Sequence, residues 1–324
     1  MRICDIPTPA LILDRQRLRS NVKRMADRAK ELGVALRPHV KTAKCAEVTK
    51  LATEGQAGGI IVSTLKEANY FFEQGFTDMI LGVGIVPAKL ASVDILQSRG
   101  AHVRVILDNP ETARMIAEKV AELSTILDVM IEIDSGGRRG GVQWSSPSLI
   151  EIGRIINSSS GLNLVGVLSH AGHSYLCKTE AELIAVAEQE RFSVASAAEQ
   201  LRKAGLPCPI VSVGATPTAL FAEHLSGITE MRPGVYTLFD VTQSALGCCS
   251  INDIAVSVLA SIIGHGSAGS YALVDAGALA LSQDRSAEHF SEGAGYGIVF
   301  DEQGKKRCHD VNVNNVNQEH GFLR

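Results

Sequence analysis

Lys41 is the residue whose position most strongly suggests covalent chemistry. It lies in the segment Arg37-Pro38-His39-Val40-Lys41-Thr42, at the end of a short apolar run. A lysine at the mouth of the first strand of a barrel can form a Schiff base with a carbonyl cofactor, because desolvation lowers its pKa. Spacing alone would favour an ordinary surface lysine. The neighbouring motif and a downstream phosphate-binding pattern favour the catalytic interpretation.

The phosphate-binding pattern is Ser212-Val213-Gly214-Ala215-Thr216, after the seventh strand-like segment. Glycine lets backbone N–H groups approach phosphate oxygens, and hydroxyl groups add donors. An ordinary turn between a strand and a helix would also contain Gly and Thr. In a (β/α)8 barrel, however, the loop after strand seven is a frequent phosphate site. An amine and a phosphate site on one rim predict pyridoxal 5'-phosphate, and Ser212, Gly214, Ala215 and Thr216 are its predicted phosphate ligands.

Other polar side chains follow the predicted strands and could complete this site. Arg139 lies in the glycine-rich loop 136–141 and could donate to a cofactor oxygen or a substrate carboxylate; a solvated turn is the alternative. Asp134 could orient this arginine or cap the loop. The segment His170-Ala171-Gly172-His173-Ser174-Tyr175 offers imidazoles and a phenol. His170, Tyr175 and Tyr236 are predicted to contact the cofactor, although each could be a buried structural residue.

The elements that must position these residues alternate between strand-like and helix-like segments. The strand-like segments are mostly continuous runs of Val, Ile and Leu, which is typical of parallel strands buried on both faces. They are residues 35–39, 59–63, 78–83, 103–107, 129–133, 164–169, 210–213 and 230–236. Eight such units predict an α/β fold, a (β/α)8 TIM barrel, although an open doubly wound sheet shares the alternation.

The regions at the two ends of the chain differ from the barrel. Asp14 is expected to cap a helix with Leu18, Val22, Met25 and Ala29 on one face. Segments 255–263 and 270–275 read as strands, and 298–305 reads as a hairpin. We therefore predict a barrel domain over residues 14–245. A C-terminal β-rich domain over 246–324 is expected to include residues 1–13 as a joining strand.

Composition excludes several other classes of protein. The net charge of −4 gives no basic surface for nucleic acid, and no apolar run is long enough for a membrane span. The seven cysteines are scattered along the sequence and form no Cys-x-x-Cys motif. No signal-peptide segment is recognisable. A reducing, cytoplasmic location is expected. No spacing typical of a metal site occurs.

Several motifs together resemble the D-threonine aldolase/D-serine dehydratase family of fold-type III pyridoxal phosphate enzymes, and the resemblance covers essentially the whole chain. Besides residues 37–42, the motifs are 62–68, 132–134, 169–172, 211–218, 232–236, 274–277 and 317–321. The resemblance implies a lyase acting on a small β-hydroxy-D-amino acid, by dehydration or by aldol cleavage. It also implies that Lys41 holds the cofactor, that Arg139, His170 and Tyr236 position its ring, and that the protein is a homodimer.

The resemblance also implies a divalent metal (Zn, Mn or Mg), held near the C-terminus by a Pro-Asn-His-x-Cys/Asp type of motif. That motif is missing here, since only Phe322-Leu323-Arg324 follow Glu319-His320-Gly321. We expect either a truncated chain or a natural variant without the metal site. Two other functions remain open: a racemase, which would need a second base such as Tyr271 or Tyr296, and a non-catalytic carrier of the cofactor.

Overall fold

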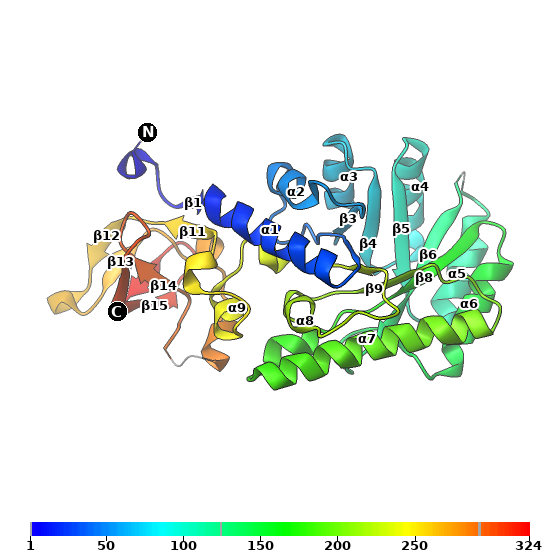
Figure 1. The fold of residues 1–324 in the computed structure, drawn as a ribbon. Coiled ribbons are helices and arrows are strands. Elements are labelled where there is room, and N and C mark those ends of the chain that lie inside the picture. Colours follow the sequence, from blue (N-terminus) through cyan, green and yellow to red (C-terminus); the bar gives the residue numbers. More distant parts are fainter. Residues whose placement is uncertain (1, 124, 291–292) are drawn as a thin grey trace. The chain divides into compact units, whose positions relative to one another are not determined.

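The computed structural model describes residues 2–123, 125–290 and 293–324. It contains two compact units. One unit runs from Val22 to Thr237, and the other combines the residues up to Asn21 with Leu238–Arg324. Helix α1 (Arg15–Glu31) spans the boundary at Asn21 (Figure 1).

The central unit contains a ring of eight parallel strands. In their spatial order these are β2 (Ala35–Leu36), β10 (Glu230–Met231), β9 (Ile210–Val213), β8 (Leu162–Leu168), β6 (Leu127–Asp134), β5 (His102–Leu107), β4 (Asp78–Gly84) and β3 (Ile60–Val62). The two ends of this order meet, because His39, just after β2, forms a parallel bridge with Ile61 of β3. The predicted barrel is therefore confirmed, and the carboxyl ends of all eight strands share one rim.

Helices surround the strands, as Figure 1 shows. They are α2 (Ala46–Thr53), α3 (Leu65–Glu73), α4 (Leu90–Ser98), α5 (Pro110–Val120), α6 (Pro147–Ser158), α7 (Glu180–Lys203) and α8 (Thr216–Phe221), with short 3-10 turns η2 (Pro87–Lys89), η3 (Gly172–Leu176) and η4 (Val235–Thr237). The predicted start of α1 is confirmed, because Asp14 Oδ1 accepts hydrogen bonds from the N–H groups of Gln16 and Arg17. In α7, Thr179 and Glu182 form a capping box, which fixes where that helix begins.

The eighth strand is shorter than the sequence predicts. The expected strand covers residues 230–236, but β10 ends at Met231. Pro233 has no N–H to extend the ladder, and at Gly234 a Cβ atom would lie 2.6 Å from the carbonyl oxygen of His39. Tyr236 consequently lies in η4 rather than in a strand. The short strand β7 (Val142–Gln143), which pairs with β6 after the glycine-rich loop, is not predicted by the sequence pattern.

The other unit is rich in strands. As predicted, the N-terminal strand β1 (Ala10–Leu13) joins it, by pairing antiparallel with β11 (Val256–Leu259). A second sheet has the order β12 (Ile262–His265), β13 (Ala272–Val274), β16 (Gly321–Leu323), β15 (Arg307–Val316) and β14 (Ile298–Phe300). The β14–β15 pair confirms the hairpin. The single strand expected over 255–263 is wrong: it is divided after Leu259, where the Ser261 N–H donates to the Asp275 carboxylate.

Short helical segments connect the strands of this unit. They are α9 (Val241–Ala245), α10 (Ala278–Leu281), η1 (Ile3–Asp5), η5 (Ile251–Asp253), η6 (Ser267–Gly269) and η7 (Ser286–His289). In the part of the chain that the structure describes, no helix combines the length and apolar character that a membrane span requires.

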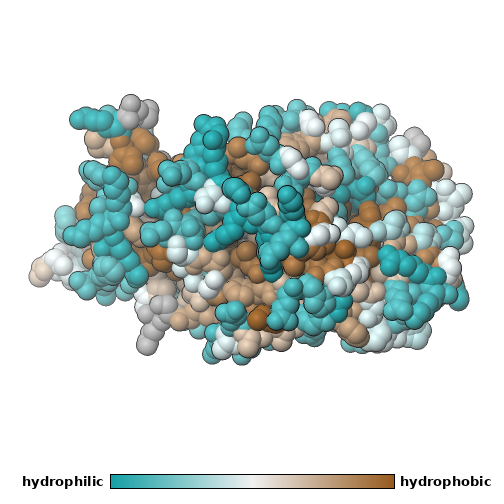
Figure 2. All heavy atoms as spheres, viewed as in Figure 1, coloured by the Kyte–Doolittle hydropathy of each residue, from teal (hydrophilic) through white to brown (hydrophobic). Residues whose placement is uncertain are grey.

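The barrel core is formed by large apolar side chains from successive strands. Ile61, Ile80, Ile106, Met130 and Leu168 form one buried cluster. In contrast, hydrophilic atoms gather over the outward face of α1 in the view of Figure 2. This division between an apolar interior and a charged helix face is what stabilises a barrel in water.

A close contact between β8 and β9 gives a test of this packing. A Cβ atom at Gly166 would lie 2.1 Å from the carbonyl oxygen of Ile210, so Gly166→Ala must separate the two strands. We expect the free energy of unfolding to fall by about 2–3 kcal/mol in urea titrations. The control is Gly84→Ala in β4, where no atom lies within 4 Å of the added methyl group. Equal stability of the two variants would contradict the close approach of β8 and β9.

Candidate active site at the barrel rim

Lys41 lies in a turn just beyond the seam where the barrel closes. Its side chain keeps solvent exposure, but the surrounding protein removes part of the hydration of the ammonium group. This desolvation lowers the pKa of Lys41, and the positive charge of Arg139 lowers it further, while Glu67 acts in the opposite direction. A lysine with a lowered pKa is a better nucleophile toward a carbonyl group.

His170 is held in the neutral state beside this lysine. Its Nδ1 is hydrogen-bonded to the carbonyl oxygen of Gly214, so Nδ1 carries the proton. Burial, and secondarily the charges of Arg139 and Lys41, lower the pKa of His170 to about 3, against the opposing effect of the Gly214 bond. The ring of Tyr175 lies with its centroid 6.4 Å from that of His170. The structure therefore brings His170 close to Lys41, Arg139 and Tyr175.

The loop that carries Arg139 is fixed by two carboxylates. Asp134 Oδ1 accepts hydrogen bonds from the N–H groups of Gly136 (3.0 Å) and Gly137 (2.7 Å). Of the two predicted roles of Asp134, the structure shows the capping of the loop. Asp108 accepts from the Gly141 N–H at 3.0 Å. Arg139 extends toward the His170 loop, since a Cβ atom at Gly172 would lie 3.3 Å from its Nε.

The predicted phosphate segment follows β9. Ala215 is the N-cap of α8 and Thr216 its first residue, and N–H groups at this position have no acceptor within the helix. The Gly214 N–H, which the sequence predicts to face the phosphate, instead donates to Glu190 of α7 at 3.2 Å. The backbone N–H groups left to donate to a phosphate in this segment are those of Ala215 and Thr216, which follow Gly214.

Tyr236 lies next to this segment, because its N–H donates to Thr216 Oγ1 at 3.2 Å. The side chain is completely buried, and its hydroxyl has no hydrogen-bond partner within the described residues. Burial raises the pKa of this phenol, which therefore stays protonated and able to donate. A buried hydroxyl without a partner is costly, so it indicates a missing polar ligand.

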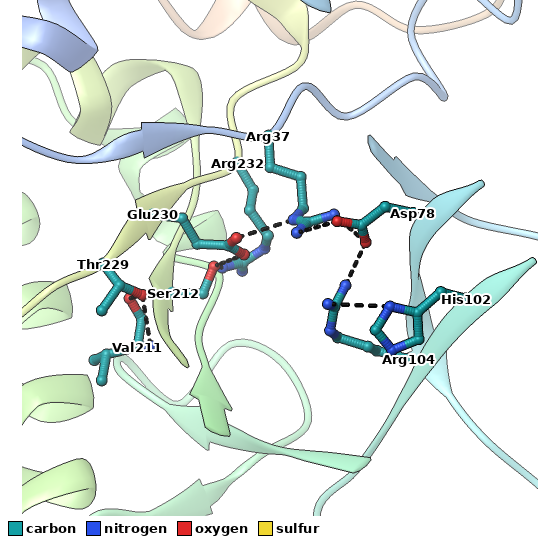
Figure 3. Close-up of polar contacts among 9 residues, drawn as sticks. All are labelled: Arg37, Asp78, His102, Arg104, Val211, Ser212, Thr229, Glu230 and Arg232. Atoms are coloured by element: carbon teal, nitrogen blue, oxygen red, sulfur yellow. Dashed lines mark hydrogen bonds and ion pairs between the residues drawn. The ribbon is translucent and has the colours of Figure 1, made fainter. Parts of the chain in front are cut away.

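A chain of charged and polar side chains, some buried and some partly exposed, links several strands of the barrel (Figure 3). Arg37 donates to Glu230 at 3.0 Å and to both carboxylate oxygens of Asp78, which also binds Arg104. On the other side of Glu230, Ser212 Oγ donates to the carboxylate at 2.7 Å and accepts from Arg232. The predicted residue Ser212 is thereby occupied with this chain of charges and is fully buried.

Two acidic residues at the site are missing from the sequence-based prediction. Glu190 lies among the apolar positions of α7, between Ala187 and Val194. An acidic residue on the apolar face of a helix is the sequence signal from which it could have been identified. Glu132 projects from β6 near Asp108, and both burial and this neighbouring charge raise the pKa of its carboxyl group. Glu132 belongs to one of the family motifs, but nothing in the sequence gives it a role.

The donor set fits pyridoxal 5'-phosphate better than it fits a metal ion. An amine with a lowered pKa, N–H groups at a helix start and the unpartnered Tyr236 hydroxyl match an aldehyde and a phosphate. A metal ion would need several acidic, imidazole or thiolate ligands together. Over residues 2–123, 125–290 and 293–324, no group of three such side chains converges.

Family comparisons agree with this fold. The description "Alanine racemase, N-terminal domain" matches residues 13–241, and "Putative serine dehydratase domain" matches residues 255–324. The chain therefore belongs to the alanine racemase-like family with a serine dehydratase domain. The predicted resemblance is confirmed, and this family supports the predicted pyridoxal phosphate cofactor.

Within this family, the chain is similar to dehydratases and aldolases, which are lyases. It is 45% identical over 319 residues to D-threo-3-hydroxyaspartate dehydratase of Delftia sp. (strain HT23), covering 98% of this chain and 83% of the relative. A solved structure of a cysteine-to-alanine mutant of D-threo-3-hydroxyaspartate dehydratase, in the metal-free form, matches with a TM-score of 0.96 and 44% identity over 100% of this chain and 85% of the other. D-threonine aldolase from Filomicrobium marinum matches with a TM-score of 0.83 and 29% identity, over 98% and 82% of the two chains.

The lowered pKa of His170 leads to a pH prediction. Its pKa of about 3 lies below the value of about 6.5 of a histidine in the unfolded chain, so the unfolded state binds a proton first. We expect the neutral His170 to make its full contribution to the free energy of unfolding above pH 6.5. This contribution should be lost progressively as the pH falls from 6.5 toward 3. NMR titration of the imidazole should show no protonation of His170 between pH 5 and 8. A midpoint near 6.5 would contradict the buried, neutral imidazole.

Proposed function

We propose that this chain is a pyridoxal phosphate-dependent lyase acting on β-hydroxy-D-amino acids, with D-threo-3-hydroxyaspartate dehydratase activity as the leading candidate. The observation that carries the proposal is the 45% identity to that dehydratase over nearly the whole chain. Lys41, with its lowered pKa at the barrel rim, supports the same chemistry from the site itself. The products would be oxaloacetate and ammonia.

The roles proposed for the site residues follow from their surroundings. Lys41 would hold the cofactor, and its amine would serve as the base that takes the proton from Cα of the substrate. The N–H groups of Ala215 and Thr216 and the hydroxyl of Tyr236 bind the phosphate. Bound pyridoxal phosphate supplies an electron sink for negative charge at Cα.

The remaining residues orient and enclose the reacting groups. Arg139 presents a guanidinium to an anionic oxygen of the cofactor or substrate. His170, neutral and bonded to Gly214, offers the face of its ring without adding positive charge. Tyr175 lies beside it, and Ser212 and Gly214 hold the phosphate segment in place through Glu230 and Glu190.

Aldol cleavage is the second candidate, supported by the match to D-threonine aldolase. In a dehydratase the Cα proton is removed and the β-hydroxyl leaves. In an aldolase the base removes the β-hydroxyl proton instead, and the Cα–Cβ bond breaks to give glycine and an aldehyde. Both reactions start from a substrate with the same amino group and would use Lys41 and the same phosphate-binding residues, so the same residues serve both.

A homodimer and a cytoplasmic location belong to the same proposal. The racemase-like architecture supports the first, and the seven cysteines, all free in the structure, support a reducing compartment. Size-exclusion chromatography with light scattering measures the first property directly.

Removal of Lys41 tests the assignment of the cofactor lysine. We expect Lys41→Ala to lose the visible absorbance band of covalently held pyridoxal phosphate, because no amine remains to bind the aldehyde. Turnover should fall by at least about 1,000-fold, which corresponds to about 4 kcal/mol. The control is Lys44→Ala. The amine of Lys44 pairs with Glu67 at 3.2 Å, so this substitution should leave the absorbance band unchanged. An unchanged band in the Lys41 variant would contradict the assignment.

Product analysis tests the reaction itself. Protein loaded with pyridoxal phosphate is incubated with D-threo-3-hydroxyaspartate, with and without Mn²⁺, and products are separated by chromatography. Oxaloacetate and ammonia are expected. Glycine and glyoxylate would establish the aldolase instead. Inversion at Cα to L-erythro-3-hydroxyaspartate, with no keto acid or aldehyde formed, would establish a racemase. If no product forms in the presence of both pyridoxal phosphate and Mn²⁺, the proposed lyase is contradicted.

A further inference from the structure

Glu190 is a buried acid that the proposed reaction does not use directly. It lies in the middle of α7, and only 1% of its surface is exposed. The helix positions around it on the same face, Leu183, Ala187 and Val194, are buried and apolar. A carboxyl group in such surroundings needs hydrogen-bond partners to compensate for lost hydration.

Three donors from three different elements surround this carboxyl group. Oε1 accepts from the Ala171 N–H at 2.8 Å and from the Gly214 N–H at 3.2 Å. Thr218 Oγ1 of α8 lies 2.8 Å from Oε2. Ala171 follows His170 directly, and Gly214 precedes the phosphate segment. Glu190 therefore holds two loops against α7, the loop after β8 and the loop after β9.

The contacts of Thr218 bear on the charge of this group. Thr218 Oγ1 also lies 3.3 Å from the carbonyl oxygen of Ala215, and its single proton can serve only one of these acceptors. If Glu190 is protonated at Oε2, it donates to Thr218 Oγ1, and Thr218 donates to Ala215. The Ala215 carbonyl also accepts from the Ala219 N–H at 3.0 Å, so an ionised carboxylate leaves no atom of the group unpaired, and the neutral acid adds one further hydrogen bond, from Thr218 to Ala215.

No positive side chain neutralises Glu190 directly. Among the residues that the structure describes, no Lys, Arg or His nitrogen forms an ion pair with it, and the guanidinium of Arg232 donates instead to Ser212 and Ser169. Burial raises the pKa of Glu190, while the bonds from Thr218, Gly214 and Ala171 and the charge of Arg232 oppose this effect. Burial is the largest of these effects, which agrees with a carboxyl group that is almost completely buried and forms no ion pair among the described residues.

We propose that Glu190 is a positioning residue, which as a neutral carboxylic acid fixes the His170 loop and the phosphate segment together. The inference rests on the proposed pyridoxal phosphate-dependent function. A neutral acid lets two backbone N–H groups be satisfied without placing a negative charge behind the segment that binds a phosphate dianion. The Gly214 carbonyl accepts a hydrogen bond from the Nδ1–H of His170, and the Gly214 N–H donates to Glu190, so the phosphate segment and the ring-binding histidine form one unit.

Two substitutions distinguish this role from simple packing. Glu190→Gln keeps the acceptor for Ala171 and Gly214 and offers an N–H to Thr218, so it reproduces the neutral acid. We expect its dissociation constant for pyridoxal phosphate, from absorbance titration of the cofactor-free protein, to stay within about threefold of the unsubstituted protein. Glu190→Ala leaves two buried N–H groups unpaired and should weaken binding by at least about tenfold. Glu199→Gln, on the exposed side of the same helix, should change neither value.

Infrared difference spectroscopy on the cofactor-free protein measures the protonation state itself. The spectrum of the unsubstituted protein minus that of Glu190→Gln should contain the carbonyl band of a protonated carboxylic acid at neutral pH. Carboxylate bands in its place would overturn the neutral state. This measurement needs only the folded Gln variant, so it holds even if Glu190→Ala fails to fold.

Separate outcomes bear on the positioning role and on the proposed function. If Glu190→Ala binds pyridoxal phosphate as tightly as the unsubstituted protein, the positioning role is overturned. A tenfold loss in Glu190→Gln would overturn the equivalence of Gln and the neutral acid. If the unsubstituted protein binds no pyridoxal phosphate at all, the proposed function fails, and the infrared result still decides the state of Glu190.

Discussion

Arg37 makes the contacts on which the barrel and its rim depend. It follows β2, and its guanidinium binds Glu230 of β10 and Asp78 of β4, on the two sides of the seam where β2 and β3 close the barrel (Figure 3). The side chain is buried, and the two carboxylates raise its pKa against the effect of burial. Lys41 lies only four residues further along, so the geometry that closes the barrel also sets the position of the candidate catalytic lysine.

A second feature of the rim is that two histidines stay neutral among several cationic side chains. His39 and His170 are both held neutral by burial and by the cations around them, which lowers their pKa values. Lys41 experiences the charge of Arg139, and the internal cation Arg232 is engaged by Ser212 and Ser169. An environment of this kind favours the free amine of a lysine and binds anions strongly, because water is partly excluded.

Dehydratases and an aldolase share this fold with high structural similarity, which has a physical basis in the site. In the proposed function, the residues around Lys41 and the phosphate segment would act on the substrate amine and the cofactor, which the two reactions have in common. A barrel with a fixed rim therefore permits two chemistries with few changes, as is usual for this architecture.

The parallel sheet surrounded by helices could be predicted from the amino-acid pattern, because continuous Val, Ile and Leu runs of strand length are typical of parallel strands buried on both faces. The number of such units favoured a barrel, and the bridge between His39 and Ile61 shows the closure. Lys41 could be identified in the same way, since its motif is local. Three features became visible only in the folded chain: Tyr236 leaves the strand, the Gly214 N–H faces α7, and Glu190 joins two loops. Each of these depends on groups that are many residues apart in the chain, such as Gly234 against His39, and local propensity carries no information about such contacts.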